Sequence, residues 1–300
     1  MKKYLIYQID AFATGKFTGN PASVVTNADG LNEKQMQLIA RELNNSETAF
    51  IFAPDDNTCD GIIRYFTPTT EVPICGHATI AAMYAKALQE KLSTATCRMK
   101  TKIGVLPFAI IADHDTYKII MTQGKVEFGN YLEETLKNKL LEALGISAAN
   151  LIQQCPIQIV STGHSKVILG INSRNLLDQL RPNDTALIAL GKMINCNGYF
   201  VFTFDSDDPE ILTYGRMFAP AIGINEDPVT GNAHGPLGAY LVHHQLVRTN
   251  GENYSFKGKQ GVALKRPGIV EVFVRLQNNE PVEIKIAGMA VMVFKTEIKL

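Results

Sequence analysis

The chain has 300 residues and no tryptophan, and its 29 lysines and arginines balance its 29 aspartates and glutamates. A chain of this length can bury a sizeable core in one large domain or two ordinary ones, and balanced charge without a basic run gives no reason to expect nucleic acid or an anionic membrane as a partner. The five cysteines are spread along the chain without a C-x-x-C pair, so neither a disulfide framework nor a zinc site is indicated.

The N-terminus carries two lysines but reaches Asp10 before a signal-peptide core could form, and no later apolar run is long enough to cross a bilayer. We therefore expect a cytoplasmic protein with no membrane partner.

The first predicted elements are strands at 4–9 and 22–25 and a helix at 32–43. The helix carries apolar residues at i, i+3, i+4 and i+7, and Asn32 followed by Gln35 is a capping-box pattern at its start. Further strands are predicted at 49–52, 62–66, 94–100, 105–111 and 117–122.

A polar turn, EVPICGHAT at residues 71–79, runs into an apolar segment at 80–88 that is typical of a buried helix. Because that helix has no clear polar face, strands are expected to wrap around it. Residues 129–154 are interpreted as a connector with a helix at 132–144, which Gly145 ends.

The turn occurs twice. EDPVTGNA at 226–233 repeats the Glu, Pro, Gly and Ala of 71–79 with an offset of 155 residues (226 minus 71) and also precedes an apolar segment. The order of the neighbouring strands repeats as well, with YFVF at 199–202 answering AFIF at 49–52 and RMFAP at 216–220 answering RYFTP at 64–68. The sequence thus predicts two pseudo-symmetric lobes, residues 1–128 with a C-terminal strand at about 288–300 and residues 129–287, with a site in the cleft between them.

Each turn places a glycine, Gly76 or Gly231, at a helix start. Helix starts offer unpaired backbone N–H groups and the positive end of the helix dipole, and a glycine there lets a ligand approach closely. We therefore expect these two turns to hold a carboxylate of a small metabolite.

Residues that differ between the copies are candidates for chemistry. Glu47 corresponds to Asn197, His77 to Asn232, and Asp227 to Val72. One carboxylate at the Glu47 position, rather than two, favours a single acid/base group.

Cys75 precedes a helix start, where a thiol is activated, but its counterpart is Thr230, which is no base at neutral pH. A two-thiol racemase is therefore not expected, and Cys75 is assigned to packing with a direct role left open as the minor alternative. The chain has no nucleotide, flavin or metal motif, so no cofactor and no metal are expected.

Five ordered motifs resemble the signature of the PhzF family of phenazine-biosynthesis-like proteins over essentially the whole chain. They are NP at 20–21, SETAF at 46–50, RYFTP at 64–68, CGHAT at 75–79 and DPVTGNA at 227–233. The resemblance implies the diaminopimelate-epimerase-like fold, an α/β (α+β) architecture in which each lobe is a rolled, mostly antiparallel sheet around a core helix. It also implies a homodimer.

In the phenazine enzyme of that family, a glutamate matching Glu47 moves a proton within a dihydro-hydroxyanthranilate without a cofactor, assisted by residues that match His77 and Asp227. The resemblance also implies substrate-binding positions at Ser46, Gly76, Gly231, Asn232 and Asn20. A serine in the family's second turn is Asn232 here, which departs from the phenazine pattern.

The sequence as a whole therefore favours a cofactor-independent isomerase that moves a proton by general acid/base catalysis on a small carboxylated metabolite, cyclic ones included. The alternative from another class is a non-catalytic ligand-binding or protein-interaction protein that keeps the cleft. A cysteine-dependent racemase or epimerase is the third possibility.

Overall fold

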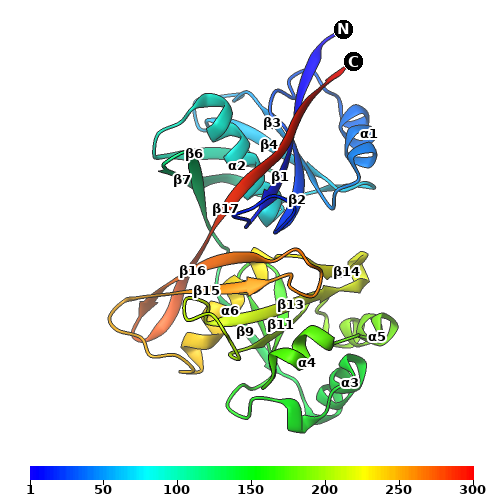
Figure 1. Cartoon of the computed structure of the whole chain (residues 1–300), viewed down its shortest axis with the longest axis vertical. Helices are drawn as coiled ribbons and strands as arrows, with labels where there is room; N and C mark the ends of the chain where they lie inside the picture. Colours follow the sequence, from blue (N-terminus) through cyan, green and yellow to red (C-terminus); the bar gives the residue numbers. More distant parts are fainter. The chain divides into compact units, whose positions relative to one another are not determined.

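The computed structural model describes residues 1–300, and the chain divides into two compact units (Figure 1). Unit 1 comprises residues 1–122 and 287–300, and unit 2 comprises residues 123–286. The observed boundary lies six residues before the predicted one (128 minus 122), and the last residues of the chain belong to unit 1. No helix in either unit combines the length and the apolar character that a membrane span requires.

Unit 1 contains two helices and a sheet. The helices are α1 Glu33–Leu43 and α2 Gly76–Glu90. The strands are β1 Lys3–Ala11, β2 Asn20–Val25, β3 Thr48–Phe52, β4 Gly61–Phe66, β5 Glu71–Val72, β6 Ala95–Thr101, β7 Gly104–Asp113, β8 Thr116–Thr122 and the later part of β17 Glu280–Lys299.

The sheet of unit 1 closes on itself. Antiparallel pairs join β17 to β1, β1 to β2, β3 to β4, β6 to β7 and β7 to β8, parallel pairs join β2 to β3 and β4 to β6, and β8 pairs again with β17. Helix α2 contacts β1, β2, β3, β7 and β8, and ten of its fifteen residues are buried. The prediction that strands wrap this apolar helix is confirmed.

Helix α1 lies outside this ring and packs its apolar face against β3 and β4 (Figure 1). The Asn32 side chain accepts a hydrogen bond from the Gln35 N–H, and the Gln35 side chain accepts from the Asn32 N–H, so the predicted capping box is present. Asn44 ends the helix with φ 52°, a left-handed conformation that asparagine tolerates.

Unit 2 contains four α-helices and the remaining strands. The helices are α3 Glu134–Leu144, α4 Arg174–Gln179, α5 Asp184–Ile194 and α6 Gly231–His243, with 3₁₀ turns η1 Ala148–Asn150 and η2 Pro220–Ile222. The strands are β9 Glu127–Tyr131, β10 Gln158–Ser161, β11 Ser165–Gly170, β12 Tyr199–Thr203, β13 Thr213–Ala219, β14 Ile224–Asp227, β15 Asn253–Gln260 and β16 Gly268–Gln277.

Unit 2 repeats the strand directions of unit 1. In unit 2 neighbouring strands follow the order β9, β10, β11, β12, β13, β15 and β16. In unit 1 the order is β17, β1, β2, β3, β4, β6 and β7. In both units the successive pairs are antiparallel, antiparallel, parallel, antiparallel, parallel and antiparallel. Helix α6 contacts β10, β11, β15 and β16 and takes the place that α2 has in unit 1. The repeat read from the sequence is thus a repeat of topology.

The stretch predicted as a connector, residues 129–154, is part of unit 2. Strand β9 pairs with β10, and α3 packs against α5 in a second apolar cluster on the outer side of the sheet. Gly145 ends α3 with φ 69°, as its position predicted. The strands β9, β15 and β16 and the short helix α4 were not predicted, although β16 carries the alternating apolar pattern of a half-buried strand.

Candidate active site

Both repeated turns are fixed to the preceding strand by the same ion pair. In unit 1, Arg64 Nε and Nη2 donate to the two oxygens of Glu71 at 2.7 and 2.6 Å. In unit 2, Arg216 donates in the same way to Glu226 at 2.9 and 2.6 Å. The Arg64 hydrogen bonds hold the pKa of Glu71 below its usual range. Two-point pairs of this kind set geometry as well as charge, so each turn is held at the start of its core helix in one orientation.

In unit 1 the turn brings His77 against the loop that follows α1. His77 is 7% exposed, and its Nε2 lies 3.3 Å from Glu47 Oε2 and 3.2 Å from Ser46 Oγ. Its other ring nitrogen, Nδ1, lies 3.4 Å from Cys75 Sγ. The imidazole therefore sits between a carboxylate and a thiol, with one nitrogen facing each.

Glu47 presents an oxygen that the protein leaves without a hydrogen-bond donor. Its side chain is 13% exposed, and Oε2 is buried without a hydrogen bond, although His77 Nε2 is only 3.3 Å away. The carboxylate oxygen and the ring nitrogen are thus close, but they are not aligned as a hydrogen bond requires. A buried carboxylate oxygen without a donor costs stability, and such costs are typical of groups held ready for a ligand or a proton.

Neither core helix is capped by a side chain at its start. The N-cap residues are Cys75 for α2 and Thr230 for α6, neither side chain makes a capping hydrogen bond to the helix backbone, and neither first turn contains an acidic residue. The first N–H groups of both helices therefore receive no hydrogen bond from an N-cap side chain, which suits an anionic ligand.

In unit 2 a buried glutamine holds the second turn. Gln260 accepts from the Thr230 N–H at 3.0 Å and donates through Nε2 to the Asp227 carbonyl at 2.7 Å and to Thr230 Oγ1 at 3.1 Å. The Thr230 hydroxyl in turn donates to Asp227 Oδ2. These bonds fix the carboxylate of Asp227 relative to the start of α6.

Helix α6 is irregular at its start. Asn232 has φ −79° and ψ 16°, outside the helical range, and Pro236 lies four residues later inside the helix. A proline has no N–H to give to the carbonyl four residues before it, and its ring collides with that carbonyl in a regular helix. The bend at Asn232 therefore follows from Pro236, and it leaves the half-buried Asn232 carbonyl without its usual helical donor.

The predicted site residues fall into two groups. Five lie together in unit 1, namely Ser46, Glu47, Cys75, Gly76 and His77, and three lie together in unit 2, namely Asp227, Gly231 and Asn232. Asn20, also predicted, is the first residue of β2 and is 1% exposed.

Sequence reasoning missed Thr230 and Gln260 as the residues that hold Asp227. Gln260 gives a weak signal, because a glutamine at the end of a strand is usually exposed, whereas this one is 1% exposed.

The group in unit 1 has ligand atoms that a metal ion could use. One atom each from Glu47, Cys75 and His77 lies within 4.8 Å of the others. However, His77 faces Glu47 with Nε2 and Cys75 with Nδ1, and one ion binds only one nitrogen of a ring. This arrangement suits proton transfer along the ring better than shared coordination.

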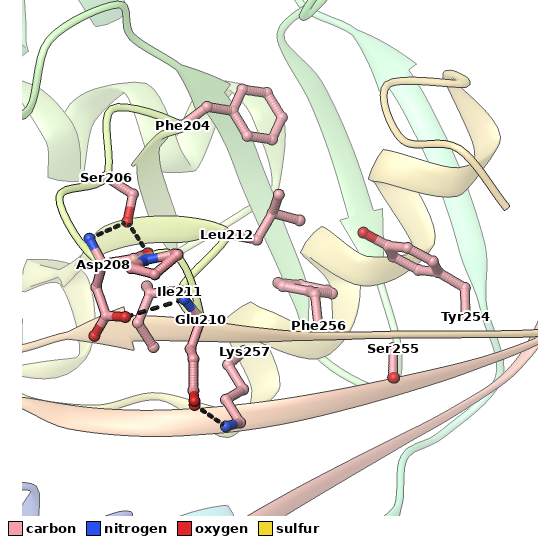
Figure 2. A pocket seen from close by; sticks show the side chains of 11 residues that line it. Phe204, Ser206, Asp208, Glu210, Ile211, Leu212, Tyr254, Ser255, Phe256 and Lys257 are labelled. Carbon is pink, nitrogen blue, oxygen red and sulfur yellow. Dashed lines mark hydrogen bonds and ion pairs between the residues drawn. The ribbon is translucent and has the colours of Figure 1, made fainter.

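A hollow of the surface lies elsewhere in unit 2. It has a volume of about 410 Å³ and lies between the loop at 204–212 and β15, with Phe204, Phe256 and Tyr254 along it and the Glu210–Lys257 ion pair at its edge (Figure 2). It contains none of the predicted site residues.

Comparisons with known proteins agree on one family. The family model described as phenazine biosynthesis-like protein (PhzC-PhzF) matches residues 9–296. The chain is 59% identical over 300 residues to an uncharacterized isomerase of Clostridium acetobutylicum, covering 100% of this chain and 99% of the relative. It is 32% identical over 292 residues to the trans-2,3-dihydro-3-hydroxyanthranilate isomerase of Pseudomonas chlororaphis, covering 97% of each.

Solved structures show the same relationship. A PhzF-family phenazine biosynthesis protein of Bacillus anthracis matches with a TM-score of 0.89 at 30% identity, covering 100% of both chains. A hydroxyproline epimerase of Agrobacterium vitis matches with a TM-score of 0.62 over 99% of this chain and 93% of its own. Since its identity is only 11%, it shows a shared fold alone.

Proposed function

The chain belongs to the phenazine biosynthesis-like (PhzF) family, is an isomerase with that family's diaminopimelate-epimerase-like fold, and on this basis we propose that it moves a proton within a small carboxylated metabolite without a cofactor. The observation that carries the proposal is the buried, donor-free Oε2 of Glu47 beside His77 Nε2. This oxygen has the position and the free lone pairs of a general base.

In the proposed reaction, Glu47 removes a proton from a substrate carbon, so a C–H bond breaks and an O–H bond forms on the carboxyl group. The electron pair shifts along the substrate, and Glu47 returns the proton at another carbon. His77 hydrogen-bonds the polar group on which charge develops, since its Nε2 lies next to both Glu47 and Ser46. No atom is lost or gained overall, as an isomerisation requires.

Asp227 is proposed to act on the same substrate from the second turn. The Thr230 hydroxyl donates to its carboxylate and Gln260 donates to its main-chain carbonyl, so the carboxylate is held in place to accept a hydrogen bond from a substrate hydroxyl or amine. The backbone N–H groups at Gly76 and Gly231 are proposed to bind the substrate carboxylate.

The substrate is proposed to be a carboxylic acid that differs from the one named for the Pseudomonas relative. Asn232 stands where the phenazine enzymes have a serine, and its amide is larger and both donates and accepts. We therefore expect the ligand at this position to carry a polar group that bonds an amide, or to be shorter there than a dihydro-hydroxyanthranilate.

The test is proton–deuterium exchange in D₂O, followed by mass spectrometry, on a panel of cyclic and α-substituted carboxylic acids that includes trans-2,3-dihydro-3-hydroxyanthranilate. Wild type is compared with Glu47→Gln, which keeps the shape and removes the base, and with Glu42→Gln, an exposed glutamate on α1. We expect exchange into at least one acid, lowered about a hundredfold or more by Glu47→Gln and unchanged by Glu42→Gln.

Equal exchange by wild type and Glu47→Gln would refute the assignment of the base. Binding of acids without any exchange would favour the non-catalytic ligand-binding protein. Loss of exchange in Cys75→Ala would restore the cysteine-dependent racemase as a candidate.

A further inference from the structure

Unit 2 contains a buried lysine that the proposed mechanism does not use. Lys166, on β11, is 7% exposed, and its ammonium makes two long hydrogen bonds, to the carbonyl oxygens of Ser165 at 3.2 Å and of His164 at 3.4 Å. No carboxylate pairs with it directly. A lysine that only packs its stem normally extends the charged end into water. The Lys166 ammonium differs, because it is buried together with the stem.

The fold makes specific room for the lysine stem. In the parallel ladder of β11 and β12, Val167 pairs with Tyr199, which places Lys166 beside Gly198. A Cβ on Gly198 would lie 2.5 Å from Lys166 Cδ, so the stem crosses the backbone where the glycine leaves space. Arg216 pairs with Val201 as Arg64 pairs with Phe50, and counted from these pairs the two places correspond to Ala22 and Glu47 in unit 1. The small and large side chains are therefore exchanged between the units.

The Lys166 ammonium lies at the start of β11. It bonds the carbonyls at the start of the strand, and it is close enough to Asp227 and Cys196 for their charges to act on it. Cys196 belongs to the loop at 195–198, which by the repeat corresponds to the loop at 45–48 that carries Glu47. Lys166 thus lies in the same part of unit 2 as Asp227, to which the proposed reaction assigns a role.

A buried ammonium with only two long backbone hydrogen bonds is poorly compensated. Such a charge is unfavourable unless another group supplies an opposite charge and better hydrogen bonds. Two of its three N–H bonds are used, and the third remains for a ligand. Asp227 does not fill this role, because its carboxylate already accepts from Thr230 and forms no ion pair with Lys166.

We propose that Lys166 is a carboxylate-binding residue, whose ammonium pairs with an acidic group of the substrate at the start of β11 in unit 2. This inference rests on the proposed function and makes its substrate class narrower, since the ligand must place an anion at this point. The start of α6, which follows Asp227 in the same unit, supplies backbone N–H groups, so the ammonium and the helix dipole would both attract the anion.

The inference has a consequence for pH. Burial lowers the pKa of Lys166 to about 8, while the nearby Cys196 thiol and Asp227 carboxylate act in the opposite direction. The other titratable neighbour, His164, has a pKa lowered by its own burial and by Lys166. Binding of an anion requires the protonated amine, so affinity should fall as the pH rises through about 8.

The test uses acetate and its uncharged partner acetamide as probes, because they need no knowledge of the substrate. The ε-methylene signals of [¹³C]lysine-labelled protein are followed by NMR, with the Lys166 signal assigned by its loss in Lys166→Met. We expect acetate to shift the Lys166 signal in a saturable way and to raise its titration midpoint, and acetamide to do neither. Lys257, which pairs with Glu210 on the surface of the same unit, is the control.

A second measurement uses any acid that exchanges deuterium. Lys166→Met keeps the stem and removes the charge, and we expect it to raise the KM for that acid about tenfold or more with a smaller change in kcat, while Lys257→Met changes neither. The fold of each variant is checked by its thermal unfolding.

The two proposals fail separately. A Lys166 signal that ignores acetate, or that responds equally to acetamide, overturns the carboxylate-binding role even if Glu47-dependent exchange is found. A specific acetate response without exchange of any acid leaves the carboxylate-binding role standing and refutes the isomerisation mechanism.

Discussion

The residues that matter most in this chain are polar groups buried with fewer partners than they can bond. Glu47 Oε2 and His234 Nε2 have no hydrogen bond, and Lys166 has two long ones. Glu47 lies in the loop before β3, His234 in α6 and Lys166 on β11. Since buried polar groups are nearly always paired, each of these groups lowers stability and is a candidate for binding or chemistry.

His234 shows how such a group affects the whole chain. It is fully buried in the first turns of α6, and its Nδ1 bonds the Thr230 carbonyl at 3.1 Å, so Nδ1 carries the proton and Nε2 is bare. Burial lowers the pKa of His234 to about 4. In the unfolded chain the same group titrates at about 6.5. Between these two values the unfolded state binds a proton that the folded state does not.

Stability should therefore fall as the pH is lowered from about 6.5 to about 4, by up to about 1.4 kcal/mol per pH unit from this group alone. The measurement is the free energy of unfolding in urea at several pH values for wild type and His234→Gln. We expect the difference between them to shift in favour of the variant on acidification. His114→Gln, at an exposed histidine, should show no such shift, and a pH-independent difference for His234→Gln would contradict the prediction.

At the scale of elements, the two core helices differ although the turns before them are alike. Helix α2 is regular from its first residue, whereas α6 is bent at Asn232 by Pro236. The regular helix carries His77, and the bent one carries Asn232 at the corresponding place. The bend therefore gives the second turn a backbone shape that the first turn lacks, and the Asn232 carbonyl receives no N–H from residue 236.

Pro236→Ala should let α6 straighten, because the new N–H at position 236 can bond the Asn232 carbonyl. We expect slower hydrogen exchange at that amide than at neighbouring first-turn amides, and an altered KM in the exchange reaction with the fold kept. Pro209→Ala, in the loop before β13, is the control and should leave KM unchanged. If the amide at position 236 is fully protected and the KM of the exchange reaction is unchanged, the bend has no part in substrate binding.

At the scale of the whole molecule, the two units are built alike but connected differently. Unit 2 is one continuous stretch, residues 123–286, whereas unit 1 needs the C-terminal residues 287–300. Strand β17 pairs with β1 from Lys3 to Ala11, and the Lys2 N–H bonds the Leu300 carbonyl at 2.9 Å, so the two ends of the chain lie side by side (Figure 1). The ring of strands around α2 closes only when the end of the chain has been made.

Removal of residues 287–300 should therefore open unit 1 and leave unit 2 folded. We expect limited proteolysis of the shortened chain to degrade residues 1–122 and to leave a resistant fragment near 123–286, identified by mass spectrometry. Removal of residues 299–300 alone should leave the whole chain resistant. A shortened chain as resistant as the full one would show that unit 1 does not depend on β17.

Local signals along the sequence were enough for many elements. The capping box at Asn32, the left-handed end at Gly145 and the all-round apolar pattern of α2 each depend on a few neighbouring residues. They were predicted correctly for that reason. The repeat of the turn, together with the motifs around it, was enough for the family and the fold.

The sequence by itself determined that two similar units each surround an apolar helix, and it identified Glu47, His77 and Asp227 as candidate catalytic residues. Both conclusions depend on patterns that can be read along the chain. Only the tertiary structure decided which buried polar groups meet. Gln260 bonds Asp227, which lies 33 residues earlier (260 minus 227), and Lys166 lies over Gly198 through the register of two strands. Such contacts join residues far apart in the chain, and register and packing, which no local propensity records, bring them together.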